Sequence, residues 1–408
     1  MRDLLIVGAG LTGLFSAALA ARRGVRVALI AEGRGSLELS HGCIDVSGGL
    51  SPHLVVQQSR ADHPYSLAGL ENLEAAIREF RSLMQSAGLP YSGDLGRALR
   101  LPTALGTEHA TSLAPAPLAA GDHASGGPLT YADLIGFRDF HAGLAAAEMA
   151  RLGAPVGEPL HLPLLDAPAH RDSYATDLAR LFDDARRREE IARAWKPQMR
   201  GVRRLALPAV IGLDRSAEAF ADLEKRLGVP ICEIPTLPPS VPGLRLEGAL
   251  RRIAVEAGAW LLDGARAVGR VDGRSDGRRV SGVVAHTAGG PRQLDAAAVI
   301  LATGGVLHGG LVARQNGLVQ ESVFDLPVTF RGEREDWTSP SALSPQSYAR
   351  FGLTVSADMR PIGAHGEPLF ENLFAAGGIL AGADRAAEGS RQGIDLATAH
   401  RALEAAGA

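Results

Sequence analysis

Three glycines close to the start of the chain have the spacing that lets a protein backbone bind a diphosphate. Gly8, Gly10 and Gly13 form a GxGxxG turn. One glycine permits a tight turn, one lets the backbone approach the phosphates, and one lets a helix pack closely on a strand. A helix that begins here also directs free N–H groups and a partial positive charge at the phosphates. The residues predicted to bind a nucleotide cofactor are therefore Gly8, Ala9, Gly10, Leu11, Thr12 and Gly13.

The elements around this turn are those that a dinucleotide-binding site requires. Residues 4–7 are an apolar run that predicts a strand, residues 11–23 predict a helix, and residues 25–30 predict a second strand. Together they form a βαβ unit, the setting in which GxGxxG becomes a specific signal for a nucleotide.

A secretory signal is the alternative for the same stretch, because residues 4–21 are apolar, uncharged and end in small residues. Three features count against it. Met1, Arg2 and Asp3 carry no net side-chain charge, the glycines would break an apolar helix, and a strand follows at once. We expect the nucleotide-binding unit, and purified protein that still begins at Met1 would agree with that.

The whole chain has the size and charge of an ordinary two-domain globular protein. It has 408 residues, 46% hydrophobic and 21% charged, and its net charge of −3 gives no attraction to nucleic acid. Cys43 and Cys232 are too few to hold an iron–sulfur cluster or zinc, so no metal site is expected. A reduced cytoplasmic protein is the default. Beyond the first stretch no uncharged run approaches membrane-spanning length, so we expect any membrane association to occur through a partner.

The remainder of the chain alternates helical and strand patterns, which predicts an α/β fold. Apolar residues recur at helical spacing in several stretches, and short apolar runs bounded by glycine or proline predict strands. The proline-rich residues 235–242 predict a rigid, extended backbone. We expect loops at residues 33–49, 47–64 and 114–128; helices at 67–87, 138–152, 172–195, 217–227, 244–257 and 393–405; strands at 205–211, 265–271, 280–285, 299–301, 355–359 and 373–375; and a turn at 272–279 within a β meander.

Three separated segments share one design, a buried strand that ends in small residues. They are residues 8–13, 302–305 and 376–378. In a doubly wound sheet the C-terminal ends of the strands meet in one crevice, where ligands bind. Each short segment alone is as consistent with an ordinary strand exit. Their order is the informative feature: GxGxxG first, ATGG after a β meander, then AAGG before a last helix.

That order resembles flavoproteins with two dinucleotide folds, of the fumarate reductase and glycerol phosphate dehydrogenase kind. More narrowly, the chain is similar over nearly its full length to the family of the B subunit of anaerobic glycerol-3-phosphate dehydrogenase. The proline-rich and GGLVA segments are specific to that family, whereas GxGxxG and ATGG occur in many flavoproteins. The segments that carry the resemblance are LPTALGTEHAT from Leu101, PTLPPSVPGLRL from Pro235, GGLVARQNG from Gly309 and ENLFAAGGILAGADRAAEGS from Glu371.

The resemblance implies a fold, a cofactor, a reaction and partners. The fold would be a Rossmann-like FAD/NAD(P)-binding α/β fold with a β meander: residues 1–110 and 243–408 would bind flavin, and 111–242 would form an inserted α+β cap or substrate domain. The flavin would be FMN, with FAD the alternative. A catalytic A subunit with FAD and an iron–sulfur C subunit would pass electrons to quinone, as glycerol 3-phosphate becomes dihydroxyacetone phosphate. The chain would be cytoplasmic and peripheral to the inner membrane.

Two other functions stay open on the same residues. One is a stand-alone flavin dehydrogenase or oxidase that acts on another small hydroxy substrate. The other is a non-catalytic subunit that stabilises a catalytic partner. A visible spectrum of the purified protein separates the last from the others, because a flavin-free subunit has no flavin absorbance.

Further cofactor contacts are expected along the glycine-rich segments. An acidic residue at the end of the second strand normally holds the adenosine ribose. The usual spacing puts that position at Ala31, so Glu32 lies one residue late and would point to the other face of a strand. It suits a mononucleotide, an altered FAD pose or a solvated strand end. The further predicted contacts are Glu32, Ser40, His41, Gly42, Thr303, Gly304, Gly305, Gly377, Gly378, Gly389 and Gln392.

Oxidation of a hydroxyl at a flavin needs a base, and a phosphorylated substrate needs cations. The candidates are His308, Arg314 and Arg391. A histidine in a glycine-rich loop is more often structural than catalytic. Arg314 has a better case, because it lies in the family-specific GGLVARQNG. Arg391 either stabilises the anionic edge of a reduced flavin or lies on the surface.

Overall fold

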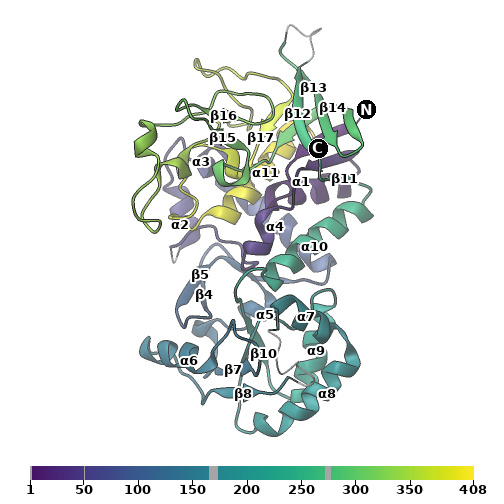
Figure 1. Cartoon of the computed structure of the whole chain (residues 1–408). Helices are drawn as coiled ribbons and strands as arrows, with labels where there is room; N and C mark the ends of the chain where they lie inside the picture. Colours follow the sequence, from purple (N-terminus) through teal and green to yellow (C-terminus); the bar gives the residue numbers. More distant parts are fainter. Residues whose placement is uncertain (1, 50, 165–172, 272–276) are drawn as a thin grey trace. The chain divides into compact units, whose positions relative to one another are not determined.

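The computed structural model describes residues 2–49, 51–164, 173–271 and 277–408 (Figure 1). The chain forms two compact units: the first comprises Met1–Ser36, Asp45–Leu83 and Leu250–Ala408, and the second comprises Leu37–Ile44 and Met84–Ala249. These boundaries differ from the expected division at residues 111 and 243. One reason for the difference is that residues 91–93 pair with residues 113–115, which joins this part of the chain to the segment after residue 110.

The first unit is built on a seven-stranded sheet whose central strands are parallel. Its order is β11-β2-β1-β14-β13-β12, and β17 pairs with the end of β14 on the side opposite β1. β1, β2, β11 and β17 run parallel to their neighbours, whereas β12, β13 and the first half of β14 form an antiparallel meander. The strands are β1 (Arg2–Val7), β2 (Val27–Ala31), β11 (Trp260–Asp263), β12 (Arg266–Val271), β13 (Val280–Thr287), β14 (Gly290–Leu301) and β17 (Leu373–Ala375).

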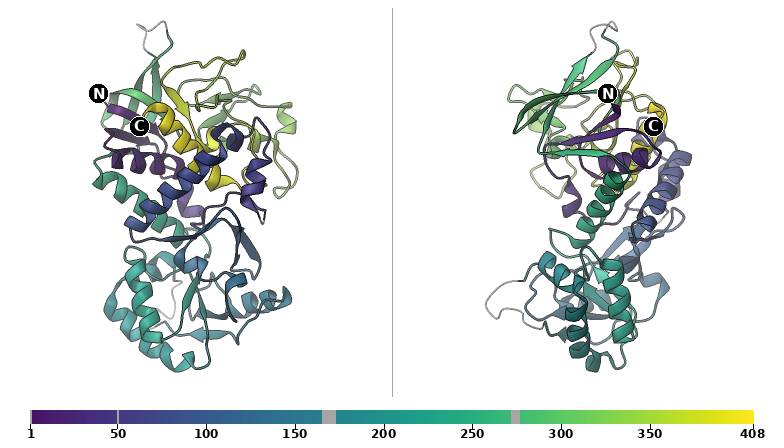
Figure 2. Two further views of the ribbon diagram at one scale, coloured as in Figure 1. Left: turned by 180° about the vertical axis from the view of Figure 1, so that it is seen from behind. Right: turned by 90° about the vertical axis from the view of Figure 1, so that its right-hand side faces the viewer.

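The predicted βαβ unit is confirmed. Helix α1 (Leu11–Arg22) lies between β1 and β2, and eleven of its residues are buried. A helix that is apolar all round must be covered on every side. Helix α11 (Arg391–Ala406) packs along α1, as both views of Figure 2 show, and Phe80 of α4 (Leu70–Ser86) makes an edge-to-face contact with Phe15, at 6.3 Å between ring centroids. The stretch considered as a secretory signal is therefore a strand, a turn and a buried helix.

The second unit contains a parallel sheet of order β10-β9-β7-β8 and two antiparallel pairs, β3-β6 and β4-β5. The proline-rich residues 235–242 lead from β10 directly into α10, which contributes residues to both units. The strands are β3 (Tyr91–Gly93), β4 (Leu99–Pro102), β5 (Glu108–Thr111), β6 (Leu113–Pro115), β7 (Thr130–Leu134), β8 (Leu160–Leu162), β9 (Leu205–Pro208) and β10 (Ile231–Ile234); the helices are α5 (Ala116–Ala119), α6 (Ala142–Arg151), α7 (Ala175–Asp183), α8 (Ala185–Trp195), α9 (Ser216–Leu227) and α10 (Val241–Glu256).

Several expected elements are wrong. Residues 47–64 include α2 (Pro52–Gln57), which begins with proline, a residue that favours the first helical position. Residues 114–128 are not a loop throughout, because β6 and α5 lie there. Residues 355–359 make only the isolated bridge of Val355 to Pro361, and Met359 has a positive φ of 61°, so a turn replaces the expected strand. Most of the turn at 272–279 lies outside the described residues.

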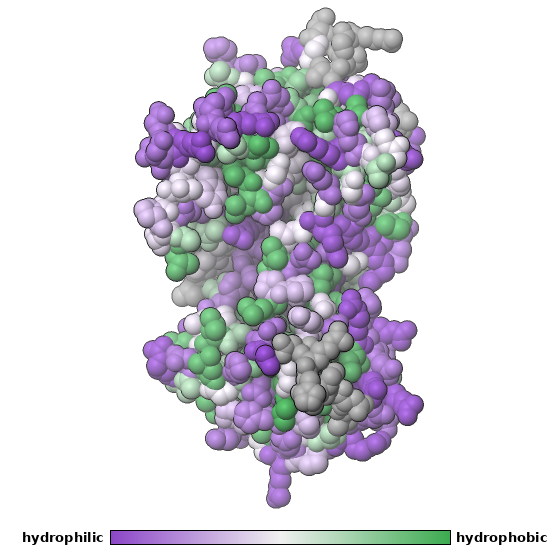
Figure 3. Space-filling view, in the orientation of Figure 1, coloured by the Kyte–Doolittle hydropathy of each residue, from purple (hydrophilic) through white to green (hydrophobic). Residues whose placement is uncertain are grey.

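The first unit also contains short elements beside its sheet. They are α3 (Pro64–Ala68), β15 (Leu311–Ala313) and β16 (Val319–Glu321), of which β15 and β16 form a hairpin. In the part of the chain that the structure describes, no helix combines the length and the apolar content that a bilayer crossing requires. The face seen in Figure 3 is largely hydrophilic, and its hydrophobic side chains form small separate groups.

Candidate flavin site

The three glycine-rich segments leave the sheet of the first unit side by side. Val7 at the end of β1 is in register with Leu301 at the end of β14, and Leu301 is in register with Ala375 at the end of β17. The strands are parallel, so their C-terminal ends lie at one edge of the sheet. Residues 8–13, 302–305 and 376–378 follow these three strand ends directly. We call them the glycine exits.

The backbones of the glycine exits touch one another. A β-carbon on Gly8 would overlap the carbonyl group of Ala302, and one on Gly305 would lie 2.9 Å from the carbonyl oxygen of Gly378. A β-carbon on Gly378 would lie 3.5 Å from the Cα of Gly304. Glycine is thus required here for close packing, and the spatial convergence inferred from the chain order is present in the structure.

Gly10 differs from the other glycines of the first turn. A β-carbon on it would meet no protein atom within 4 Å, although one on Gly13 would overlap the carbonyl of Gly8. Gly10 is also the N-cap of α1, whose N-terminus has no side-chain cap and no acidic residue in its first turn. The uncapped helix end carries a partial positive charge. This open, electropositive position fits a phosphate group, whereas Gly8 and Gly13 serve the packing around it.

The chain after β2 returns across this turn. A β-carbon on Gly35 would lie 2.5 Å from the Cα of Gly10, so Gly35 lets the returning backbone reach the turn. The sequence reasoning did not select Gly35, although its place in a glycine-rich loop after the second strand is a usable signal. Glu32 is exposed and follows Ala31, the last residue of β2. Because the strand ends there, the alternation of side chains along a strand does not fix the direction of Glu32.

Three buried polar atoms near the glycine exits lack a hydrogen-bond partner. They are Thr303 Oγ1, Gln392 Oε1 and Arg385 Nε. A buried polar atom without a partner costs about 1–3 kcal/mol, so native proteins rarely keep one without a reason. Thr303 and Gln392 are predicted cofactor contacts, and Arg385 is a residue that sequence reasoning missed. A bound polar ligand would supply the missing partners.

Arg385 connects the last glycine exit to α1 and α11. A β-carbon on Gly378 would overlap its guanidinium Nη1, and its Nη2 donates to Asp395 Oδ1 at 2.7 Å and to the carbonyl of Arg391 at 3.0 Å. Asp395 also accepts the Thr12 hydroxyl at 2.9 Å. One carboxylate therefore ties the first turn of α1 to α11, and holds Arg385 against the glycine exits.

Two of the three predicted catalytic residues lie in this region. A β-carbon on Gly304 would lie 2.6 Å from the Cβ of His308, which places His308 beside the second glycine exit. Partial burial lowers the pKa of His308 below 6.5, and the positive charges of Arg385 and Arg391 lower it further, against the opposing effect of Asp395. His308 is therefore neutral at physiological pH and able to accept a proton. Arg391 is exposed at the first position of α11.

The third predicted catalytic residue has its contacts elsewhere. Arg314 lies at the tip of the β15–β16 hairpin, where it lines an open surface depression. Its Nε donates to Gln320 Oε1 at 2.6 Å, and its backbone N–H donates to the carbonyl of Leu318 at 2.7 Å. Both partners belong to the same hairpin. A catalytic role for Arg314 stays a prediction.

The predicted contacts Ser40, His41 and Gly42 belong to the second unit. The Gly42 N–H donates to Ser40 Oγ at 3.1 Å, the Gly42 carbonyl accepts the Tyr91 hydroxyl at 2.6 Å, and His41 lies on His109 with 4.5 Å between ring centroids. Within that unit these contacts order the loop, and cofactor binding by these three residues stays a prediction.

Gly389 and Gly377 each have a conformational role. Gly389 has a φ of +61°, and a β-carbon on it would lie 2.7 Å from the backbone nitrogen of Gly48. Gly377 has a φ of +76°, and its N–H donates to Thr398 Oγ1 at 2.8 Å. A side chain at Gly377 would overlap the Thr12 hydroxyl. These glycines therefore bring α1, α11 and the loop before α11 close together.

Comparison with known proteins places this geometry in a family. The family model described as FAD binding domain matches residues 3–394. The chain is 32% identical to the B subunit of anaerobic glycerol-3-phosphate dehydrogenase from Yersinia pestis bv. Antiqua, over 97% of the chain and 96% of that protein. It is 31% identical to the protein of the same name from Pectobacterium atrosepticum, over 98% and 97%. The open form of a flavocytochrome c3 fumarate reductase shares 11% identity with a TM-score of 0.45, over 99% of this chain and 78% of that one.

Proposed function

Since the chain belongs to the FAD-binding family and, within it, to the family of the anaerobic glycerol-3-phosphate dehydrogenase B subunit, we propose that it binds FAD at the glycine exits and acts in the oxidation of glycerol 3-phosphate to dihydroxyacetone phosphate. The observation that carries the proposal is the register of three parallel strands, which brings three glycine exits to one edge. The family description supports FAD, and the FMN implied by the resemblance has no support in it.

The diphosphate would lie at Gly10 and the uncapped N-terminus of α1. Gly10 offers open space, and the first-turn N–H groups of α1 favour an anion. Thr303, Gln392 and Arg385 would supply polar contacts from their unpartnered buried atoms. These residues fit a molecule that is both anionic and rich in hydrogen-bonding groups.

Glu32 would distinguish FAD from FMN, because only FAD has an adenosine ribose for a carboxylate to hold. Glu32→Ala should then weaken FAD binding by about tenfold and leave FMN binding unchanged, since one charged hydrogen bond is worth about 1.5–3 kcal/mol at most. Titration of the apoprotein with each nucleotide measures both constants. Equal effects on both nucleotides would contradict the assignment of Glu32 to the ribose.

His308, Arg385 and Arg391 would handle the substrate in the same unit. The flavin, when bound, accepts two electrons from the substrate carbon. His308 has the lowered pKa of a group that can take the proton of a hydroxyl. Arg385 and Arg391 place positive charge around it, and a phosphorylated substrate needs such charge. His308→Gln should therefore retain flavin and lose its reduction by substrate.

Partner subunits belong to the same proposal. The relatives are named as one subunit of an enzyme, so we infer a complex with a catalytic A subunit and an iron–sulfur C subunit, through which electrons reach membrane quinone. In that arrangement the chain meets the membrane only through its partners.

The deciding experiment is to release the bound nucleotide from purified protein, measure its mass, and follow flavin bleaching by glycerol 3-phosphate with and without the catalytic partner. The proposal expects FAD, and bleaching that is fastest in the presence of the catalytic partner. Protein without flavin, or protein that another alcohol reduces rapidly while glycerol 3-phosphate does not, would overturn it.

A further inference from the structure

Arg385 uses only part of its hydrogen-bonding capacity. A guanidinium carries N–H donors on all three of its nitrogens. Nη2 of Arg385 donates to Asp395 Oδ1 at 2.7 Å and to the carbonyl of Arg391 at 3.0 Å. Among the described residues the buried Nε finds no acceptor, and Nη1 makes no hydrogen bond. Arg188, a buried arginine of the second unit, instead bonds through all three nitrogens. Arg385 therefore keeps donors that a ligand can use.

The guanidinium of Arg385 lies beside two of the glycine exits. A β-carbon on Gly378 would overlap Nη1, and the same β-carbon would lie 3.5 Å from the Cα of Gly304. The second and third glycine exits are therefore both close to this cation. Partial burial lowers the pKa of His308, and the positive charge of Arg385 lowers it further. That effect is consistent with a guanidinium whose charge reaches the site.

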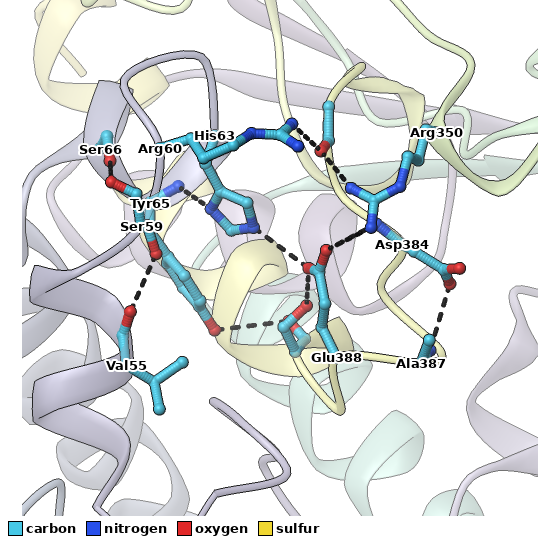
Figure 4. Close-up of polar contacts among 12 residues, drawn as sticks. Val55, Ser59, Arg60, His63, Tyr65, Ser66, Arg350, Asp384, Ala387 and Glu388 are labelled. Carbon is cyan, nitrogen blue, oxygen red and sulfur yellow. Dashed lines mark hydrogen bonds and ion pairs between the residues drawn. The ribbon is translucent and has the colours of Figure 1, made fainter. Parts of the chain in front are cut away.

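The backbone that carries Arg385 is held by Glu388 (Figure 4). Glu388 Oε1 accepts the Asp384 N–H at 3.0 Å and lies 3.3 Å from Arg350 Nη2, and Oε2 lies 3.1 Å from His63 Nε2. These contacts attach the segment before α11 to two other parts of the first unit. The direction of the Arg385 side chain then depends on what its guanidinium contacts.

Asp395 makes that contact through one carboxylate oxygen. Its Oδ1 accepts from Arg385 Nη2 and also from the Thr12 hydroxyl, at 2.9 Å. The side chains of Asp395 and Arg385 are 13% and 19% exposed, so salt screens this pair less than a surface pair. Thr12 lies in the first turn of α1, next to Gly10 where the phosphates are expected. One oxygen therefore fixes the cation relative to the predicted phosphate-binding turn.

We propose that Asp395 is a positioning residue that keeps the free donors of Arg385 directed at a phosphate group bound at the glycine exits. Arginine suits a phosphate, because its planar guanidinium stays charged and offers several N–H groups. The negative charge of Asp395 by itself opposes anion binding, so its favourable effect comes through the position of Arg385. The phosphate belongs to the cofactor diphosphate or to glycerol 3-phosphate, and the inference rests on the proposed function, which supplies both.

The test is a double-mutant cycle of wild type, Asp395→Ala, Arg385→Ala and the double variant. In one arm, flavin-free protein is titrated with FAD and with riboflavin, which has no phosphate. In the other arm, flavin-loaded protein is titrated with inorganic phosphate and with glycerol 3-phosphate. In the arm that contains the true ligand, Arg385→Ala should weaken phosphate binding by about 100-fold and Asp395→Ala by about tenfold. The double variant should be no weaker than Arg385→Ala, because Asp395 acts through Arg385.

Asp395→Asn separates the position of Arg385 from the charge beside it. The amide Oδ1 can accept both hydrogen bonds, whereas the negative charge is gone, so phosphate affinity should stay within about threefold of wild type. Asp358→Ala is the matched control, because Asp358 also bonds an arginine of the first unit, Arg360 at 3.1 Å. This control should bind every ligand as wild type does.

Gly378→Ala tests the same position while Asp395 is kept, because its β-carbon displaces the Arg385 guanidinium, and it should match Asp395→Ala. Phosphate affinity that is unchanged in Asp395→Ala, equally low in Asp395→Asn, or clearly lower in the double variant than in Arg385→Ala would overturn the inference. Equal losses for FAD and riboflavin, with phosphate and glycerol 3-phosphate unaffected, would overturn it too, since they indicate a damaged fold. Wild-type protein that binds neither flavin nor glycerol 3-phosphate would instead overturn the proposed function.

Discussion

Arg245 and Glu233 in the second unit, and Arg385 and Asp395 in the first, are ion pairs that lie largely out of solvent. The first pair is almost completely buried, with side chains 2% and 0% exposed, whereas the second pair is 19% and 13% exposed. Arg245 makes two hydrogen bonds to Glu233, at 2.5 and 3.0 Å, and two more to the carbonyls of residues 211 and 212. Around Arg385, by contrast, three polar atoms lack partners.

The difference teaches which cluster is structural and which is prepared for a ligand. Glu233 also accepts the Ile211 N–H at 2.7 Å, so the pair in the second unit joins β10, α10 and the chain after β9 with its charges paired. In a fully satisfied buried network every polar atom already has a hydrogen-bond partner, so no ligand is needed. Unpartnered buried atoms beside an uncapped helix end still need hydrogen-bond partners, which a bound cofactor would supply. Substitutions in one cluster at a time can therefore test this difference.

The largest effect should come from breaking the satisfied pair. Glu233→Ala leaves Arg245 buried without its counter-charge, which costs about 3–5 kcal/mol. Hydrogen exchange of β9 and β10 should report this loss as faster opening of the second unit. Glu371→Ala, in an exposed pair with Arg279, should cost about 0–1 kcal/mol. If Glu233→Ala lowers the free energy of unfolding by less than about 1 kcal/mol, the pair of Arg245 and Glu233 is no more important for stability than an exposed pair.

Gly10→Val should have the next largest effect, and on binding more than on stability. The valine side chain would enter open space where the phosphates are expected, so we expect flavin affinity to fall by about 100-fold, or roughly 2.7 kcal/mol. Flavin retention and the unfolding temperature of the same preparation measure the two effects. Gly143→Val is the matched control, because Gly143 lies in the first turn of α6 and its added side chain also meets no atom within 4 Å. Normal flavin content in folded Gly10→Val would contradict the phosphate assignment.

The parts of the candidate flavin site that could be predicted are those whose signal lies in neighbouring residues of the sequence. The first turn, the late glycine exits and α11 were all predicted, because a glycine directly after an apolar run by itself indicates the end of a strand. Proline at the start of α2 was an equally local signal that the sequence reasoning did not use. Strand β11 was missed because it is only four residues long and, as an edge strand, is only partly buried.

Other parts of the site could not be predicted because their meaning depends on distant residues. Arg385 is an ordinary arginine until Gly378 and Asp395 are placed beside it. Ser390 is of a residue type favoured at the N-cap, but its backbone ψ of 9° and the contact of its hydroxyl with Glu388 leave α11 without a side-chain cap. The proposed cation Arg391 was selected for its place in a glycine turn, whereas Arg385 is the arginine that lies against a glycine exit.

Replacing the unpartnered Gln392 should change stability and binding in opposite directions. Gln392→Met removes a buried oxygen without a partner at similar volume, so the flavin-free protein should gain about 1 kcal/mol. Flavin binding should weaken by about tenfold if Oε1 contacts the cofactor. Ser112→Ala removes another unpartnered buried atom, in the second unit, and should stabilise without changing flavin affinity. Unchanged flavin affinity in Gln392→Met would place Gln392 outside the site.

The smallest effect concerns the acid stability of the first unit. Burial raises the pKa of Glu388, but the hydrogen bonds from His63 and Asp384 and the charge of Arg350 outweigh it, so the folded pKa lies below 4.5. A carboxyl group whose folded pKa is depressed stabilises the protein above its unfolded pKa, and this contribution is lost as the pH falls through the folded pKa. The unfolding temperature of wild type should therefore fall more steeply than that of Glu388→Gln between about pH 5.5 and pH 3.5.

Glu371→Gln is again the control, because it removes one titrating carboxylate from an exposed pair of the same unit. Its unfolding temperature should follow wild type through the same acid range. Parallel curves for wild type and Glu388→Gln would show that the carboxylate adds no stability to the first unit. A steeper wild-type curve would show that the contacts of Glu388 with His63, Ser390 and Arg350 stabilise the unit (Figure 4). In that case each unit contains a carboxylate whose contacts stabilise the fold, Glu233 in the second unit and Glu388 in the first.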